Sequence, residues 1–109
     1  MSPEAENAVV VLVTCGTEEE AVRIGRTLVT ERLAACASLA GPVRSIYTWQ
    51  GTVEDEQEHL VMIKTRASCV EALTHRVLDL HSYEVPEVLA LPACGGNPAY
   101  LCWIEEVTA

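Results

Sequence analysis

VRSIYTWQGTVEDEQEHLVMIKT, residues 43–65, has the pattern of a long β-hairpin. Side chains alternate between two faces from Val43 to Gln50, which is the period of a strand. Gly51 stands between the two arms, where a tight turn requires a positive φ. The second arm runs through an acidic stretch and ends as HLVMIKT near Arg66. The stretch therefore predicts two antiparallel strands that are long for a small domain.

A strand and a helix precede this hairpin. AVVVLVTC, residues 8–15, is continuously apolar and β-branched, which indicates a strand covered on both faces. Thr17 and Glu20 have the spacing of a capping box, and apolar residues then recur at helical spacing. We predict a helix of about 17 residues that ends near Ala34. Gly41–Pro42 then predicts a break or a bulge before the hairpin.

A helix and a strand follow the hairpin. Ser68 and Glu71 have the spacing of a second capping box, which predicts a helix over residues 68–81. A short apolar run predicts a strand over residues 88–91, and Pro92 stops it.

A short C-terminal helix over residues 99–104 is predicted from Asn97 as its N-cap and Pro98 at its first position. The order of elements is then β-α-β-β-α-β plus this helix, which is the split βαβ or ferredoxin-like plan. We predict an α+β fold, with a four-stranded antiparallel sheet and two helices on one face. The chain forms one domain, residues 8–109, after a disordered tail, residues 1–7.

The composition excludes several classes of protein. The chain has 109 residues, with 7 basic against 16 acidic side chains and a formal net charge of −9. Such a surface repels phosphate backbones and anionic lipids, so we expect neither nucleic acid nor a membrane surface as a partner. Half of the residues are hydrophobic, which favours burial of apolar surface against copies of the same chain.

The expected location is cytoplasmic. Residues 1–8 lack the basic segment of a secretory signal, and the longest apolar run, residues 8–13, is too short to span a bilayer. The five cysteines are scattered without a CxxC pair. Their spacing predicts reduced thiols and excludes a structural zinc site of paired cysteines.

Several motifs, taken in order along the chain, resemble those of one family. They are ERLAAC at residues 31–36, SIYTWQG at 45–51, IKTR at 63–66, HSYEVPE at 81–87 and GGNPAY at 95–100. Together they resemble the CutA divalent-cation tolerance proteins from about Val10 to Ile104. The resemblance implies a ferredoxin-like fold and a tight homotrimer whose hairpin arms pair between subunits. It also implies a link to tolerance of copper and other divalent ions.

A metal site implied by the resemblance is matched only in part. The ligands proposed for the family, one cysteine and two adjacent histidines, fall on Val13, Leu80 and His81 here. Cys15 points to the same side as Val13, because side chains alternate along a strand. His81 and Cys15 are therefore the predicted metal ligands, for copper above zinc. The alternative for His81 is a histidine at a helix end that bonds the last carbonyls.

Five further residues are candidates for binding a small molecule near the cleft between subunits that the resemblance implies: Tyr83, Glu87, Lys64, Trp49 and Cys36. Lys64 lies in an apolar strand and needs a carboxylate partner, Glu58 or Glu87, and a structural ion pair at the trimer interface is favoured over a catalytic role. Trp49 fits either interface packing or a pocket wall, and Cys36 fits either core packing or a soft metal ligand. No organic cofactor is evident.

Three functions are compatible with these residues. The first is a cytoplasmic homotrimer that binds divalent or transition-metal cations in metal tolerance. The second is a trimeric sensor similar to the PII proteins, which would bind a metabolite between subunits and use Arg44, Lys64 and Arg66 for phosphates. The third is a hydrolase or lyase that uses Lys64, Tyr83 and Glu87. No set of nucleophile, base and orienting group is legible, so we expect no enzymatic activity.

Overall fold

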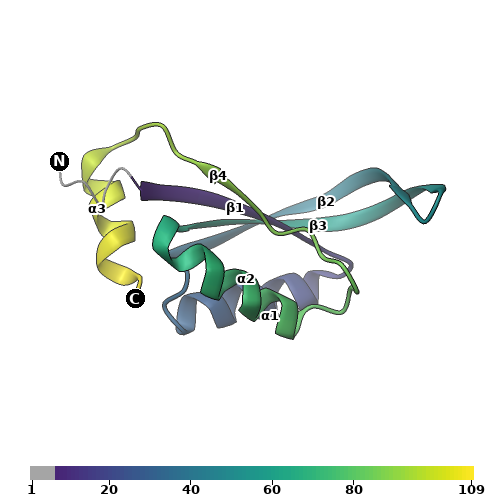
Figure 1. Cartoon of the computed structure of the whole chain (residues 1–109), viewed down its shortest axis with the longest axis horizontal. Helices are drawn as coiled ribbons and strands as arrows, with labels where there is room; N and C mark the ends of the chain where they lie inside the picture. The colour runs from purple at the N-terminus through teal and green to yellow at the C-terminus, as the bar shows by residue number, and fades with distance from the viewer. Residues whose placement is uncertain (1–6) are drawn as a thin grey trace.

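The structure, a computed structural model, describes residues 7–109 (Figure 1). Its elements are β1 (Ala8–Cys15), α1 (Glu18–Thr30), β2 (Cys36–Trp49), β3 (Thr52–Arg66), the 3-10 helix η2 (Ala67–Cys69), α2 (Val70–Leu80), β4 (Leu89–Pro92) and α3 (Pro98–Val107). The sheet has the strand order β2-β3-β1-β4, and each strand is antiparallel to its neighbours. The predicted α+β, ferredoxin-like fold is confirmed. The predicted tail, residues 1–7, falls outside the described residues except for Asn7.

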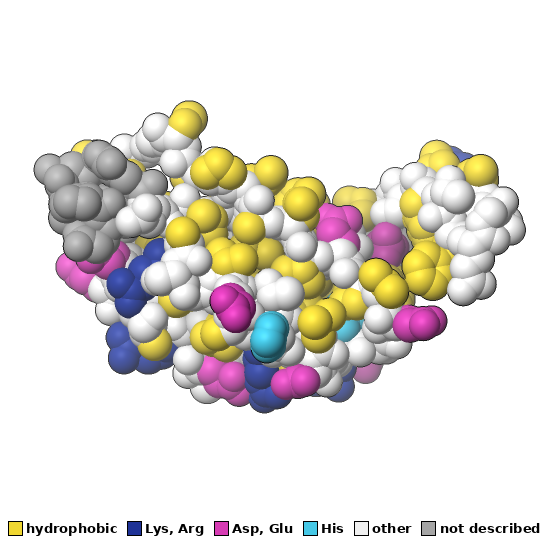
Figure 2. All heavy atoms as spheres, viewed as in Figure 1, with side chains coloured by type: hydrophobic (Ala, Val, Ile, Leu, Met, Phe, Trp, Pro, Cys, Tyr) yellow, Lys and Arg dark blue, Asp and Glu magenta, His cyan; other side chains and the backbone are white. Residues whose placement is uncertain are grey.

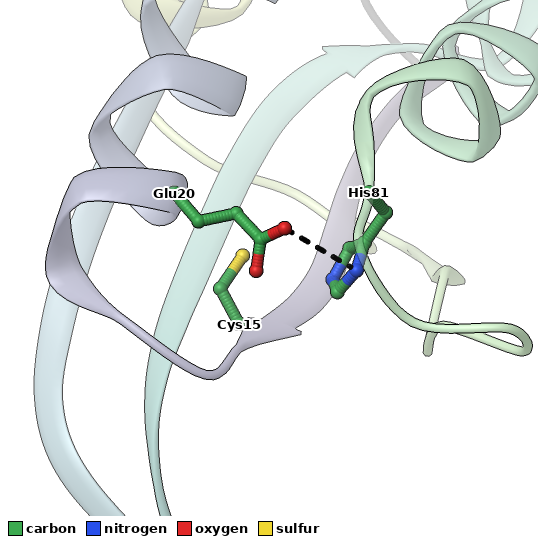
Figure 3. A group of neighbouring side chains, drawn as sticks. All are labelled: Cys15, Glu20 and His81. Atoms are coloured by element: carbon green, nitrogen blue, oxygen red, sulfur yellow. Dashed lines mark ion pairs between the residues drawn. The ribbon is translucent and has the colours of Figure 1, made fainter.

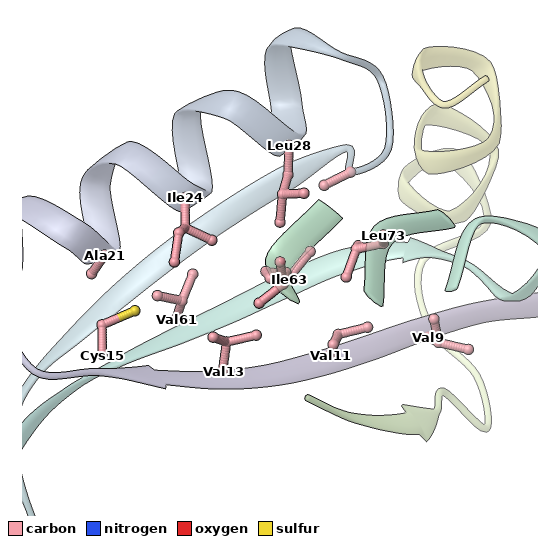
Figure 4. Packing of buried hydrophobic residues seen from close by; sticks show 12 residues of the cluster. Val9, Val11, Val13, Cys15, Ala21, Ile24, Leu28, Val61, Ile63 and Leu73 are labelled. Atoms are coloured by element: carbon pink, nitrogen blue, oxygen red, sulfur yellow. The ribbon is translucent and has the colours of Figure 1, made fainter. Parts of the chain in front are cut away.

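The hydrophobic core lies between the sheet and the two helices α1 and α2, which cover the same face of the sheet (Figure 1). Alternate residues of β1, including Val11 and Val13, point into this layer and are fully buried. Leu28 of α1, Ile63 of β3 and Leu73 of α2 meet them there (Figure 4). The core therefore comes from one face of each strand and one stripe of each helix, as the sequence periodicities require.

β2 and β3 form the predicted hairpin, which projects beyond the rest of the sheet (Figure 1). Its turn consists of Gln50 and Gly51, with φ of 50° and 80°. Two successive positive φ angles are those of the tight turn whose twist matches a hairpin. The strand register shifts between Ala40 and Val43, so the predicted bulge at Gly41–Pro42 is present.

Helix α1 is shorter than predicted, because it ends at Thr30 rather than near Ala34. Arg32 adopts a left-handed conformation, with φ of 62°, and the amide that follows it donates to the Leu28 carbonyl at 2.9 Å. This is the chain reversal that glycine usually makes at a helix end. Here the Arg32 guanidinium bonds the Val107 carbonyl, 3.3 Å away near the C-terminus, which helps to offset the cost of the conformation.

The predicted capping box at Ser68 is not formed. Ser68 lies inside η2, and α2 begins after Cys69, which is helical itself and makes no capping bond through its side chain. An N-cap residue needs an extended backbone, and Arg66 has that conformation two positions earlier. The chain therefore enters this helix through a 3-10 turn.

β4 and α3 lie within a few residues of their predicted positions. β4 includes Pro92, which is tolerated because β4 is an edge strand of the sheet formed by the described residues. Asn97 caps α3 by accepting the Ala99 amide at 3.0 Å. α3 closes one end of the sheet, with Leu101 packed near Ala8. Within residues 7–109, no helix combines the length and the apolar character needed to cross a membrane.

The sheet face opposite α1 and α2 is apolar and largely uncovered. Leu12 and Val10 of β1 lie on it, because they alternate with the core residues of that strand. They pair in register with Leu89 and Leu91 of β4, which are 53% and 45% exposed. We call these four residues the open sheet face.

Candidate functional site

Three side chains with metal-ligand atoms meet at the C-terminal end of β1 (Figure 3). Cys15 is the last residue of β1, Glu20 lies in the first turn of α1, and His81 is the residue that caps the end of α2. A sulfur, a carboxylate oxygen and a ring nitrogen lie within 4.8 Å of one another, and all three residues are buried. We call them the donor cluster. The fold brings the two predicted metal ligands together and adds Glu20.

The His81 ring is held by two backbone groups. Its Nε2 lies 2.8 Å from the Thr14 carbonyl oxygen, and its Nδ1 lies 3.0 Å from the Tyr83 amide nitrogen. A carbonyl accepts and an amide donates, so these partners fit a ring that donates through Nε2 and accepts at Nδ1. The 3.8 Å separation of Nδ1 from Glu20 becomes an ion pair only when the ring is protonated. The ring bonds a strand carbonyl, not the last carbonyls of a helix as the alternative for His81 expected.

Glu20 is the anionic member of the donor cluster. Its carboxylate accepts the Ser82 amide at 2.8 Å, and its own amide donates to Thr17 Oγ1 at 3.2 Å, which confirms that half of the predicted capping box. Burial raises the pKa of Glu20, but the hydrogen bonds from Ser82, together with the charge that His81 carries when it is protonated, lower it by more, so the net pKa lies below its ordinary value. The carboxylate is therefore ionised at neutral pH.

Cys15 contributes a thiol, not a thiolate, at neutral pH. Burial, together with the negative charges of Glu20 and Glu58, raises the pKa of Cys15 to about 12. A metal that binds sulfur must displace this proton, and a metal that binds His81 must also displace the Tyr83 amide from Nδ1. The donors suit a transition metal in kind, and the competing proton and amide predict an affinity that rises with pH.

A pocket of about 550 Å³ lies beside the donor cluster, at the base of the projecting hairpin. Figure 2 shows acidic and hydrophobic side chains in the hollow between the body of the molecule and the hairpin. Trp49, Tyr83 and Glu87 line this pocket, as does Glu58, whose Oε2 accepts the Tyr83 hydroxyl at 2.8 Å. Three of the five candidates for small-molecule binding therefore lie together. We call this space the hairpin pocket.

Lys64 and Cys36 lie elsewhere and face each other across β2 and β3. Lys64 Nζ donates to Ser38 Oγ at 3.1 Å, and no carboxylate in residues 7–109 lies within ion-pair distance of it. The expected ion pair with Glu58 is wrong within one chain, because six residues of strand separate the two by about 20 Å. Cys36 Sγ lies 3.6 Å from the Tyr100 hydroxyl. The proposed catalytic group of Lys64, Tyr83 and Glu87 is therefore not assembled within one chain.

Two residues of these sites were not predicted from the sequence. The sequence pattern predicts Glu20 only as part of a helix cap, although its position five residues after Cys15, across a tight strand-to-helix connection, indicates that the two lie close together. From the sequence, Glu58 is a possible partner for Lys64 and a member of the acidic hairpin arm, but not a residue of this pocket. Its side chain is 5% exposed and bonds a tyrosine that lies 25 positions further along the chain. No local pattern shows that contact.

The fold and the site define a small ferredoxin-like protein with a buried Cys–Glu–His donor cluster and an apolar open sheet face. The chain belongs to the CutA1 family, whose profile, described as "CutA1 divalent ion tolerance protein", matches residues 9–107. The membership predicted from the motifs is confirmed.

Named relatives support this membership. Mouse Protein CutA is 51% identical over 96 residues, which cover 88% of this chain and 54% of the mouse protein. The divalent-cation tolerance protein CutA of Thermus thermophilus is 48% identical over 99 residues, which cover 91% of this chain and 96% of that protein. The chain therefore spans about half the length of the mouse relative and nearly all of the bacterial one.

Solved structures agree with this assignment. The divalent cation tolerance protein (Cut A1) from Thermus thermophilus matches with a TM-score of 0.92 and 46% identity, over 94% of this chain and 99% of that one. CutA1 from Oryza sativa matches with a TM-score of 0.90 and 42% identity, over 94% of each chain.

Proposed function

We propose that this protein is a cytoplasmic homotrimer that binds a divalent or transition-metal cation, copper above zinc, and acts in metal tolerance without catalysis. The observation that carries the metal proposal is the donor cluster, where sulfur, nitrogen and oxygen ligands lie within 4.8 Å of one another. Thiolate and imidazole are ligands that favour copper. The five cysteines are free thiols, which supports a reducing compartment.

A calorimetric titration tests metal binding. Reduced, anaerobic protein is titrated with copper(II) and, separately, with zinc(II), and we expect one ion per chain. The affinity for each ion should fall at least about tenfold in His81→Ala and in Cys15→Ser, because each variant removes one ligand atom. Binding should release protons and should tighten as the pH rises, since the Cys15 thiol must lose its proton.

His75→Ala is the matched control, because His75 is an exposed histidine on α2. Its affinity should equal that of the wild type. Cys15→Ser leaves the ring of His81 on its two backbone partners, so it separates loss of a ligand from loss of local structure. The proposal is refuted if the wild type binds no ion below millimolar concentration. It is also refuted if the metal affinity of the wild type is no higher than that of both cluster variants.

The homotrimer proposal is supported by the open sheet face, whose leucines would otherwise remain in water. Sedimentation equilibrium of the wild type should give three times the chain mass of 11.8 kDa. Leu91→Glu places a charge on this face and should shift the mass toward that of one chain. Leu78→Glu is the control, since Leu78 is 51% exposed on the helix side of the molecule, and it should leave the mass unchanged. A monomeric wild type at micromolar concentration would contradict the trimer.

A further inference from the structure

The walls of the hairpin pocket carry acidic and aromatic side chains. Tyr47, Trp49 and Tyr83 supply the aromatic walls. Four glutamates also line the pocket, among them Glu58 and Glu87, and no lysine, arginine or histidine is among its lining residues. Aromatic faces and carboxylates share one preference, since both attract a positive charge.

The strongest evidence for a bound cation is the carboxylate of Glu58, which has no cationic partner among the described residues. It lines the pocket and is only 5% exposed, yet no basic side chain in residues 7–109 lies within ion-pair distance of it. Among these residues, the one hydrogen-bond donor to its carboxylate is the neutral hydroxyl of Tyr83. A carboxylate that is buried without a cation costs free energy that a bound cation would recover.

A second carboxylate faces the same space. Burial raises the pKa of Glu87, and the negative charge of Glu58 raises it further, so the two carboxylates, which line the same pocket, repel each other. A positive charge bound between them would relieve this repulsion.

The size of the pocket selects the kind of cation. A bare metal ion fills a small fraction of about 550 Å³, whereas small organic molecules occupy pockets of this size. A phosphate or nucleotide ligand is disfavoured, because it would meet four glutamates and no basic lining residue. We infer that the hairpin pocket binds a small organic cation, an alkyl ammonium whose charge meets Glu58 and Glu87 and whose carbon chain lies on Trp49 and Tyr47.

This inference does not rest on the metal proposal, since the two sites share no residue. A titration of reduced protein with 1,4-diaminobutane tests this inference. Binding is measured by calorimetry and, separately, by the fluorescence of Trp49. Trp103→Phe as a background leaves Trp49 as the one tryptophan, because the chain has two. Trp103 lies on α3, outside the pocket lining.

We expect saturable binding of one diamine per chain with a change in Trp49 emission. Glu58→Gln and Glu87→Gln should each weaken it at least about tenfold. Glutamine at position 58 keeps an acceptor for the Tyr83 hydroxyl, so the variant tests charge, not folding. Glu71→Gln, an exposed change on α2, is the control and should bind as the wild type does.

Several results would overturn the inference. The first is that the neutral analogue 1,4-butanediol binds as tightly as the diamine. The second is that both glutamine variants bind the diamine with the affinity of the wild type. The third is that the wild type binds no diamine below millimolar concentration. A divalent cation such as Ca²⁺ that binds through Glu58 and Glu87 while the diamine does not would also refute it. A loss of the trimer in Glu58→Gln would refute it as well, because the Glu58 carboxylate would then bind a group of a neighbouring subunit and not a ligand.

Discussion

Replacing Ile63 by alanine should lower the free energy of unfolding by about 3–4 kcal/mol, which is typical of a fully buried aliphatic side chain. Ile63 has no exposed surface and stands at the centre of the core, where β3 pairs with Val11 of β1 beneath both helices (Figure 4). The variant loses the contacts of three carbon atoms on all sides and leaves a cavity, because strands that are paired on both edges cannot move in to fill it.

Denaturation by guanidinium chloride measures this effect, at one fixed protein concentration because self-association couples to unfolding. Leu78→Ala is the control, since Leu78 is half exposed on the outer side of α2, and it should change the free energy by less than about 1 kcal/mol. An Ile63→Ala variant that loses no more than this control would show that the core does not lie where the structure places it.

Much of the fold could be predicted from the sequence because its signals are local. The hairpin turn needs only Gly51 after a stretch of strict alternation, and Asn97 and Pro98 open α3 by adjacent chemistry. The end of α1 was mispredicted because its cause is not local. Arg32 holds its left-handed conformation with bonds to residues more than 70 positions away, which no sequence window contains.

The sites divide in the same way. Strand alternation and the family resemblance placed Cys15 and His81 together, although metal binding by them stays a prediction. Lys64 and Glu58 cannot pair within one chain, because strand spacing alone separates two residues six positions apart on the same strand; a pair between subunits stays a prediction. The bonds from Ser82 to Glu20 and from Tyr83 to Glu58 join segments that only the folded loop after α2 brings into contact.

Replacing Glu20 by alanine should lower the free energy of unfolding by about 2–3 kcal/mol. The reason is the Ser82 amide, which donates to the Glu20 carboxylate at 2.8 Å and would lose its acceptor. The carboxylate also lies 3.9 Å from the Arg23 guanidinium and ties the loop after α2 to the start of α1. Glu19→Ala, an exposed change in the same helical turn, is the control and should cost only a few tenths of a kcal/mol.

The dependence on pH identifies the carboxylate as the cause. The folded pKa of Glu20 lies below its ordinary value of 4.5, so ionisation of Glu20 adds stability at pH values above 4.5. This contribution is lost as the pH falls through the lower, folded pKa. Glu20→Gln has no such group, so its deficit relative to the wild type should be largest near neutral pH and should shrink on acidification. A deficit that is constant from neutral pH to about pH 3 would mean that the lost interaction does not involve the charge of Glu20.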